Sequence, residues 1–524
     1  MPELRAPFVL RPRWDFYAGL IFLSVMMFQA ASWYRFPLFL DDYYHLAVVQ
    51  GFRDAGGWVG QAFWEYAPAG RPHLYPPLLH IIQLSVYYLG ADLIAIARLS
   101  NVVVYPFFLF VCWFVARRIV GARPAFWLAF LLTSSESLYL AVINNIPFTL
   151  AFCFGLWSYL ALDKGRWAAA AAALGLSFYT HNLVPWLFLT AYIVYAFFER
   201  DKRAIVGRAV VGALFLSFPL LVHQARYISY VRMVRLMDFY YVRFHLGLMA
   251  VAVPGIWSSL RRKGLCRFLL VLGAVFLCLT VTHRSRLFSG HGLFFLCFFG
   301  AMALDRFWEL LPHGDRSRKA VCAAVLIFIF HILGAHIVWD PVARKVSHVV
   351  GDTPVLYWLG RPQEAAGIKA ETIFYPKWIM QCVRMVTDRT ERGDILFSNY
   401  NYAGGMVAVL SHRATSCAML PEVRPFRDDD PVAGARWILW FKDASGALPP
   451  DMGLLAVTYA LEPVEETEIA ILWKRGAVVQ QERVVASKFP FGICLAFVMG
   501  LLGAAAAGGF RPQAGDAGSQ GERP

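Results

Sequence analysis

Long apolar runs separated by short polar segments dominate the chain up to residue 339. A helix that crosses the hydrocarbon core of a bilayer needs about 20 apolar residues. Runs of this kind predict membrane spans near 15–33, 98–116, 124–142, 146–162, 167–180, 183–198, 204–222, 244–260, 268–282, 287–304, 320–338 and 489–508. We therefore expect a polytopic α-helical membrane protein with about 12 spans.

One further apolar run, "LYPPLLHIIQLSVYYLG" at 74–90, decides the orientation of the others. If it crossed the membrane, the basic segment at 116–124 and the basic loops up to 267 would face outward, against the usual bias of Lys and Arg toward the cytoplasm. If it lies along the outer face, the N-terminus and all basic loops face the cytoplasm. We therefore expect a juxtamembrane helix at 74–90, entered through a proline-rich first turn.

The remaining organisation follows from changes in polarity. A multi-span membrane domain is expected over 1–339, with a first outer loop at 33–97. The more polar stretch 340–487 alternates short β-like runs, "DILFSN", "RWILWFK", "LLAVTYALE" and "IAILWKR", with helical segments, which predicts a small extracytoplasmic α/β domain. A last transmembrane helix at 488–510 and a disordered tail at 511–524 complete the chain.

Composition supports a membrane protein. Hydrophobic residues make up 58% of the chain and charged residues 16%, against about 25% in soluble proteins. The formal charge of +14 comes from short loops between apolar runs, so it indicates membrane orientation and argues against nucleic acid as a partner. Cys382 and Cys417 lie in the polar region and could form a disulfide there. Ala-, Gly- and Arg-rich usage points to a bacterial inner membrane.

Polar side chains converge on the outer face that this topology predicts. They are Asp41 and Asp42 after the first span, with His45 nearby, Glu136, Asn144 and Asn145, His181, and His283, Arg284 and Arg286. Ionisable groups at a membrane are costly and mark functional sites by default. Each also has a structural interpretation: Asp41 or Asp42 as a helix cap, Glu136 as a paired acid, His45 as a packing residue and the arginines as interfacial anchors.

Carboxylates and arginines on one face suit a specific kind of chemistry. A carboxylate can act as the general base toward an acceptor hydroxyl or amine. The pair could alternatively hold a divalent cation, Mg²⁺ or Mn²⁺, through Asp41 and Asp42. Arginines can offset the charge of a leaving lipid phosphate. Of the two acids, we assign Asp41 as the base and Asp42 as the cap.

The opening "LDDYYHL" followed by "YPPLLH" resembles the GT-C superfamily of membrane glycosyltransferases, which use polyprenyl-linked sugars. The stretch from "GADLIAIARLSNVVVYPFF" onward is similar to protein O-mannosyltransferases and aminoarabinose transferases. "DDYYHL", and the outer segment at 393–418, are similar to oligosaccharyltransferase catalytic subunits. In that outer segment, however, 399–403 reads "NYNYA" in place of a Trp-Trp-Asp-Tyr-Gly signature. The resemblance implies that Asp41 or Asp42 is the base or a metal-associated carboxylate.

These observations predict an inverting glycosyltransferase that moves a sugar from a polyprenyl-phosphate donor to a glycan, lipid or protein acceptor outside the cytoplasm. Asp41 and Asp42 are its candidate catalytic residues, and the other converging side chains are candidates for binding substrate and phosphate. "INNIP" at 143–147 lacks the acid that many relatives carry there, which weakens a cation site. The alternatives are an O-antigen-type polymerase or ligase, and a transporter or flippase of lipid-linked glycans.

Overall fold

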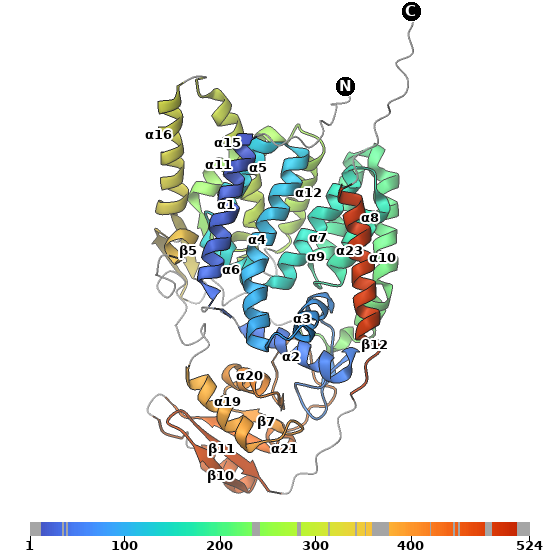
Figure 1. Cartoon of the computed structure of the whole chain (residues 1–524), viewed down its shortest axis with the longest axis vertical. Helices are drawn as coiled ribbons and strands as arrows, with labels where there is room; N and C mark the ends of the chain where they lie inside the picture. Colours follow the sequence, from blue (N-terminus) through green and yellow to red (C-terminus); the bar gives the residue numbers. More distant parts are fainter. Residues whose placement is uncertain are drawn as a thin grey trace, which may run out of the picture.

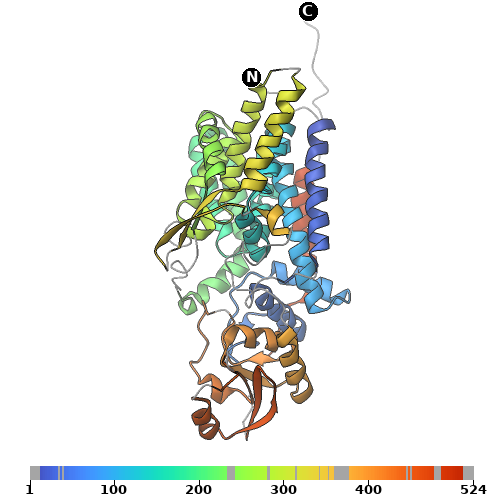
Figure 2. The ribbon, with the colours of Figure 1, turned by 90° about the vertical axis from the view of Figure 1, so that its left-hand side faces the viewer.

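The computed structural model describes residues 12–33, 36–37, 40–232, 242–279, 284–312, 315–340, 343–351, 353–358, 377–419, 421–443, 446–448, 451–476 and 485–510. A bundle of helices forms one part of the molecule, and a smaller α/β domain lies beyond one end of it (Figure 1). Two helices of the first loop, α2 and α3, lie between the two parts, and the side view in Figure 2 shows the same arrangement. We call this end of the bundle the site end.

The bundle consists of apolar helices, most of which contribute side chains to a large buried core. Its helices are α1 (Pro12–Ala31), α4 (Leu93–Ile119), α5 (Ala122–Leu132), α6 (Glu136–Asn144), α7 (Ile146–Asp163), α8 (Trp167–Phe178), α9 (Val184–Phe198), α10 (Arg203–Arg226), α11 (Leu246–Ser259), α12 (Leu265–Phe276), α15 (Leu293–Leu310), α16 (Arg316–Ile327) and α23 (Phe491–Phe510). Shorter turns are η2 (Arg200–Lys202), η3 (Ile228–Tyr230), α14 (Arg284–Phe288), η5 (Phe328–Leu333) and α17 (Pro354–Trp358).

Six helical segments of the described chain are long and apolar enough to cross a membrane: 13–31, 93–119, 146–163, 200–226, 286–310 and 491–508. Shorter apolar helices, including α8, α9, α11 and α12, run beside them in the same bundle (Figure 1). The chain is therefore polytopic, and the count of about 12 spans stays a prediction.

The run at 124–142, which we expected to form one straight span, is broken. Helices α5 and α6 meet at an angle of 84°. Between them, the Thr133 hydroxyl donates to the Phe130 carbonyl (2.9 Å) and the Ser134 hydroxyl donates to the Leu131 carbonyl (2.7 Å). Ser135 then caps the next helix by accepting from the Leu138 amide at 3.2 Å. Hydroxyls that bind the backbone compete with helix continuation, so the polar residues end α5 and restart the chain as α6.

The first loop folds into a compact layer at the site end. Helix α2 (Leu40–Ala55) is followed by the short strands β1 (Gly57–Trp58), β2 (Gln61–Ala62) and β3 (Arg71–Pro72) and by α3 (Leu78–Tyr88). Helix α3 begins directly after Pro77, in the segment expected to form a juxtamembrane helix. It has 11 residues, which is too short to cross a bilayer, and it lies against α2 and the first turns of α4 (Figure 1).

The α/β domain is built on a five-stranded mixed sheet in the order β10-β11-β9-β7-β8. Its strands are β7 (Ile395–Ser398), β8 (Ala414–Thr415), β9 (Trp437–Phe441), β10 (Leu461–Glu466) and β11 (Ala470–Arg475), and its helices are α19 (Lys377–Arg389), α20 (Asn401–Leu410), α21 (Pro431–Gly434) and α22 (Asp451–Thr458). Strand β7 is parallel to both β8 and β9. The carboxyl ends of these three strands therefore share one edge of the sheet.

Two details of this region differ from the sequence-based expectation. The run "LLAVTYALE" was expected to be a strand, but residues 451–458 form helix α22 and the strand starts only at Leu461. Residues 345–349 do not join the five-stranded sheet. They form β6 (Lys345–Val349), which pairs with β5 (His336–Asp340), and β5 pairs with β4 (Val242–His245), so this second sheet belongs to the bundle. A final strand, β12 (Phe489–Pro490), pairs with β1 before α23 begins.

Ion pairs tie together the helix ends that lie opposite the site end. Arg117 binds Asp15 at 2.8 Å, Arg123 binds Asp305 at 2.5 Å and Arg267 binds Glu199 at 2.6 Å. In each pair, an arginine in or beside a basic loop binds an acid on, or directly after, a helix that is distant in sequence. The concentration of basic residues at this end agrees with the charge pattern from which we inferred a cytoplasmic side.

Candidate functional site

The two adjacent acids of the first loop occupy the first turn of α2, but their environments differ. Asp42 is 4% exposed, and its Oδ1 accepts a hydrogen bond from Asn101 Nδ2 on α4 at 3.1 Å. Asp41 is open to solvent. One acid therefore anchors α2 to the bundle, while the other faces the space at the site end.

The charges around Asp41 come from three separate parts of the chain. Although Asp41 keeps solvent-accessible surface, many protein atoms lie around its carboxyl, and the resulting loss of hydration raises its pKa. The positive charge of Arg286 opposes the shift, and the carboxylate of Glu422 adds to it. The charge of Asp41 in turn helps to raise the pKa of Tyr75, which burial already raises. Asp41 thus interacts electrostatically with Arg286 of the bundle, Glu422 of the α/β domain and Tyr75 of the first loop.

Arg286 packs against an aromatic ring at the site end. Its guanidinium lies over the ring of Phe148, with 5.7 Å from Cζ to the centroid. The Phe148 ring also contacts two histidine rings: His291, stacked at a centroid distance of 4.1 Å, and His181, edge-on at 5.1 Å. His291 Nε2 also lies 2.8 Å from the Thr149 hydroxyl. Stacking on Phe148 orients the guanidinium, a group whose planar fork matches the geometry of a phosphate.

The predicted residues around 283 are only partly described. His283 lies outside the described residues. Arg284 begins α14, and the structure describes its backbone alone. Among His283, Arg284 and Arg286, the structure therefore describes the side-chain contacts of Arg286 alone.

Glu136 forms an ion pair, as one of its two interpretations from the sequence allowed, but the partner was not predicted. Its carboxylate is completely buried and lies 3.2 Å from the Arg243 guanidinium, which also donates to the Ser137 hydroxyl at 3.2 Å. The backbone amide of Arg243 donates to the Ser289 hydroxyl at 2.6 Å, which fixes β4 beside α14. Arg243 precedes an apolar run, and its sequence position alone gave no reason to place it near Glu136.

Three histidines of the first loop form a buried cluster behind Asp41. His45 Nδ1 lies 3.0 Å from His80 Nε2, and the His73 ring packs edge-on against His80 at 6.2 Å. Burial lowers the pKa of His45 to about 3, so this side chain is neutral at neutral pH. His45 therefore holds α2 against α3 and offers a phosphate no charge.

The other predicted polar residues lie at helix starts and ends. Asn145 caps α7 by accepting from the Phe148 amide at 3.3 Å, and His181 Nδ1 accepts from the amides of Leu183 and Val184 at the start of α9. Asn144 ends α6, and its buried Oδ1 has no hydrogen-bond partner among the described residues. Asn144 is thus the member of this group with an acceptor left over.

A buried ion pair joins the first loop to the α/β domain. Arg71 and Glu65 are both fully buried and lie 2.7 Å apart. Arg71 also donates to the Tyr44 hydroxyl of α2 at 3.1 Å, and the second oxygen of Glu65 accepts from the Met419 amide at 2.9 Å. This chain of contacts runs from the helix that carries Asp41 to the domain that carries Glu422.

Metal binding receives no support from the described residues. Among them, no group of three or more His, Cys, Asp or Glu side chains is arranged to hold an ion. Asp42 is turned toward Asn101, away from the open space that Asp41 faces. The acid pair therefore does not form a chelating set, and we derive no step through a metal.

The disulfide considered for Cys382 and Cys417 is not formed, because both are free thiols.

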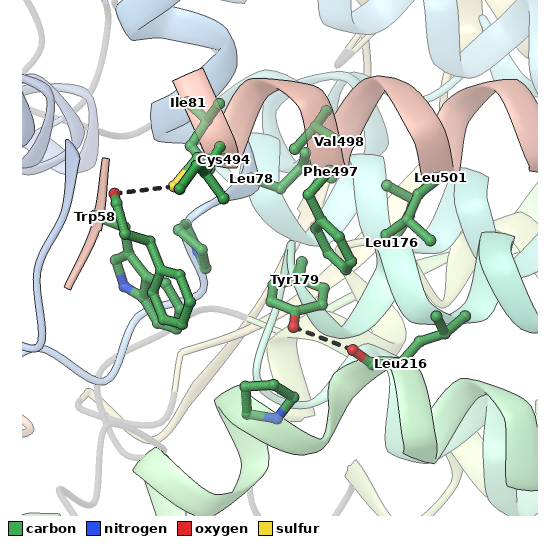
Figure 3. Close-up of a pocket in the computed structure, with 14 residues that line it drawn as sticks. Trp58, Leu78, Ile81, Leu176, Tyr179, Leu216, Cys494, Phe497, Val498 and Leu501 are labelled. Atoms are coloured by element: carbon green, nitrogen blue, oxygen red, sulfur yellow. Dashed lines mark hydrogen bonds between the residues drawn. The ribbon is translucent and has the colours of Figure 1, made fainter. Parts of the chain in front are cut away.

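Three cavities lined by described residues are large enough to consider as binding sites. The first, about 160 Å³, is lined by side chains of α3, α8, α10 and α23 and is almost wholly apolar. Figure 3 shows its aliphatic and aromatic lining; the hydroxyl of Tyr179 is engaged by the Leu216 carbonyl at 3.1 Å. A second, of about 320 Å³, runs between α11, α12 and α15, and its polar lining residues are Arg243 and His245. A third, polar cavity of about 350 Å³ lies where the α/β domain meets Tyr66 and Ala67 of the first loop.

No protein-family model matches the sequence, and no curated protein matches it closely in sequence. Solved structures do share its fold. ArnT from Cupriavidus metallidurans, solved with undecaprenyl phosphate bound, gives a TM-score of 0.56 at 13% identity over 91% of this chain and 99% of ArnT. An apo oligosaccharyltransferase from Archaeoglobus fulgidus gives 0.55 at 9% identity over 82% of this chain and 70% of that one. The arabinofuranosyltransferase AftD from Mycobacteria gives 0.53 at 13% identity over 90% of this chain and 42% of AftD. The resemblance drawn from "LDDYYHL" and "YPPLLH" is thereby confirmed in three dimensions: this chain has the fold of the GT-C membrane glycosyltransferases.

Proposed function

We propose that this protein is a glycosyltransferase that moves a sugar from a polyprenyl-phosphate donor to an acceptor at the site end of the bundle. One observation carries the proposal: the open carboxylate of Asp41 lies within electrostatic reach of Arg286, at the junction of the bundle, the first loop and the α/β domain. A base and a phosphate-binding cation are the two groups that such a displacement requires. ArnT, solved with undecaprenyl phosphate, and the dolichol-phosphate complex of an archaeal oligosaccharyltransferase share the fold and support this donor class.

The reaction balances with these two groups. The acceptor oxygen or nitrogen attacks the anomeric carbon of the donor as Asp41 takes its proton. The bond between that carbon and the phosphate oxygen breaks, and the electron pair leaves with the polyprenyl phosphate. Arg286 stabilises the charge that develops on this phosphate, because a fixed guanidinium needs little reorganisation in the transition state. A single displacement of this kind inverts the anomeric configuration.

The cavity between α11, α12 and α15 is suited to the donor lipid. Its walls are apolar, as a polyprenyl chain requires, while Arg243 lines its polar part. Leu287, the residue after Arg286, also lines this cavity. A chain lying there would bring its phosphate toward both arginines. The first cavity has no charged lining residue and fits a phosphate less well.

Asp42 then has a positioning role. Its hydrogen bond to Asn101 fixes the first turn of α2 against α4 and so determines where Asp41 lies. Glu136 acts similarly through Arg243, whose guanidinium it orients. Both assignments follow from burial, because a fully enclosed carboxylate does not reach an acceptor.

We further propose that the site end faces the extracytoplasmic side of a bacterial inner membrane. The basic loops at the opposite end support this orientation. The acceptor is a glycan, a lipid or a protein.

Purified protein in nanodiscs, incubated with undecaprenyl-phosphate hexose and pentose donors and a membrane extract as the acceptor source, tests the proposal. We expect Asp41→Asn to reduce transfer by about 10²- to 10⁴-fold, the usual contribution of a general base. Asp54→Asn, at the far end of the same helix and exposed to solvent, is the matched control and should leave transfer unchanged. Full activity of Asp41→Asn would contradict the mechanism, and translocation of the donor without any covalent product would favour a flippase.

A further inference from the structure

The polar cavity of the α/β domain lies where parallel strands end. Ser398 ends strand β7 and Asn399 follows it, Ser416 and Cys417 follow strand β8, and all four line the cavity. Loops at the carboxyl ends of parallel strands are the usual place for ligand binding in open α/β sheets. A volume of about 350 Å³ is at the small end of the range for ligand pockets. The fold therefore presents this cavity where a small ligand is expected.

Several polar groups in the cavity are already engaged within the protein. Asn399 exchanges hydrogen bonds with the Phe441 backbone at 3.0 and 2.8 Å. Asp430 caps α21 by accepting from the Val432 amide at 2.9 Å, and Asp429 forms an ion pair with Arg427 at 3.3 Å. These groups shape the walls of the cavity and have little capacity left for a ligand.

Ser416 is different. It is only 4% exposed, and its hydroxyl has no hydrogen-bond partner among the described residues apart from the weak interaction with the neighbouring Cys417 thiol. A buried polar group without a partner costs free energy. The cavity also carries the carboxylate of Asp428 and the amide of Asn401, which are exposed to solvent. Donors and acceptors thus converge on a space that the protein itself does not fill.

An aromatic side chain of the first loop closes one side of this cavity. Tyr66 has a left-handed backbone conformation, with φ of 50°, which is uncommon for a residue other than glycine. Its amide donates to the Cys417 carbonyl at 3.3 Å, and the next amide, of Ala67, donates to the Thr415 carbonyl at 3.0 Å. Strained backbone of this kind gathers at binding sites, where the surrounding structure holds it. The cavity therefore lies at the junction of the two parts of the molecule.

The same stretch of chain links the cavity to Asp41. It runs from Ser416 through Met419, which Glu65 binds, to Glu422, whose charge acts on Asp41, and on to Asp428. Phe426 is also tied to the first loop, because its amide donates to the Gly70 carbonyl at 2.9 Å. A ligand in the cavity is thus held by the segment that borders the proposed reaction site.

We propose that this cavity binds the acceptor through a hydroxyl-rich, uncharged group such as a sugar ring. The inference rests on the proposed function, and it selects a glycan-bearing acceptor. Ser416, Asn401 and Asp428 supply hydrogen bonds to hydroxyls, and Tyr66 supplies an apolar ring face. The carboxylates of the cavity disfavour an anionic group, and its polar lining disfavours a lipid tail.

Saturation-transfer NMR on the full-length protein in nanodiscs, with methyl hexopyranosides as the probes, tests this inference. We expect the wild-type protein to bind at least one probe, and Asp428→Asn and Ser416→Ala each to weaken that binding by about tenfold, as the loss of one good hydrogen bond predicts. Asp388→Asn, an exposed acid on α19, is the matched control and should bind as the wild type does. Ser416→Ala removes a single oxygen, so it keeps the test informative if Asp428→Asn folds poorly.

Absence of binding by every probe, or equal binding by all variants, would overturn the inference. Failure of the proposed function is a separate result. Asp41→Asn should bind the probes normally, so an active Asp41→Asn protein would remove the mechanism while the probe measurement still reports on the cavity.

Discussion

Breaking the buried ion pair between Arg71 and Glu65 should cause a large loss of folding stability. In Glu65→Gln, the shape of the side chain is kept but its charge is removed. The Arg71 guanidinium then remains fully buried without a counter-ion. Burial by itself lowers the pKa of Arg71, but its interactions with Glu65 and Tyr44 together more than offset this effect and raise it. The buried guanidinium therefore stays charged, with the Glu65 carboxylate as its counter-ion.

The size of the effect follows from these contacts. Removing one partner of a buried ion pair costs about 3–5 kcal/mol. Arg71 retains its hydrogen bonds to the Tyr44 hydroxyl and the Pro72 carbonyl, so we expect the lower limit, about 3 kcal/mol. Replacing both partners, in Glu65→Leu with Arg71→Met, removes the uncompensated charge. The cost that remains is the unpaired Tyr44 hydroxyl and Met419 amide, about 1–3 kcal/mol each.

Thermal unfolding in detergent, followed by tryptophan fluorescence, measures this effect. Glu65→Gln, Glu65→Leu and Arg71→Met should each lower the apparent Tm. The Glu65→Leu/Arg71→Met double variant should lose less than the sum of its two single variants, because the coupling within this double-mutant cycle isolates the pair. Glu465→Gln breaks the exposed pair with Arg389 and serves as the control, with an expected cost below about 1 kcal/mol. An unchanged Tm in Glu65→Gln, or strictly additive losses in the double variant, would refute the reasoning.

Three further predictions concern the site and the bundle. The charge of Arg286 lowers the pKa of Asp41, so Arg286→Gln should raise that pKa further and move the acidic limb of the pH–rate profile to higher pH. An unmoved limb would show that Arg286 does not act on the ionisation of Asp41. Arg243→Gln should raise the KM for the polyprenyl donor by about tenfold in steady-state assays, and an unchanged KM would remove Arg243 from donor binding. Gly255→Ala should lower the apparent Tm, because its Cβ would lie 1.8 Å from the Phe299 carbonyl oxygen, whereas Gly19→Ala, with open space around it, should not.

Some features could be inferred from the sequence because they depend on local pattern or on charge. The placement of α3 at the site end followed from the positive charge of the loops, because the bias of Lys and Arg toward the cytoplasm constrains the orientation of every span. The sequence predicted different roles for Asp41 and Asp42, but it did not predict the contact between Asp42 and Asn101, which lie 59 positions apart.

Other features required the folded chain. The pairing of Arg243 with Glu136 joins residues 107 positions apart, and the effect of Glu422 on Asp41 crosses from one part of the molecule to the other. The break at 133–135 was missed because hydropathy averaged over a window hides three consecutive hydroxyl residues in an apolar run. The expected strand at 454–462 was wrong because a short apolar run fits either a strand or a helix.

The anomeric configuration of the transferred sugar tests the central claim most directly. With Asp41 as base and direct departure of the phosphate, one displacement occurs at the anomeric carbon. NMR of the product made by the wild-type protein from an undecaprenyl-phosphate sugar of known configuration should therefore show inversion, and Asp41→Asn should form little of it. Retention of configuration would require a covalent intermediate or a second displacement, and would contradict the role assigned to Asp41.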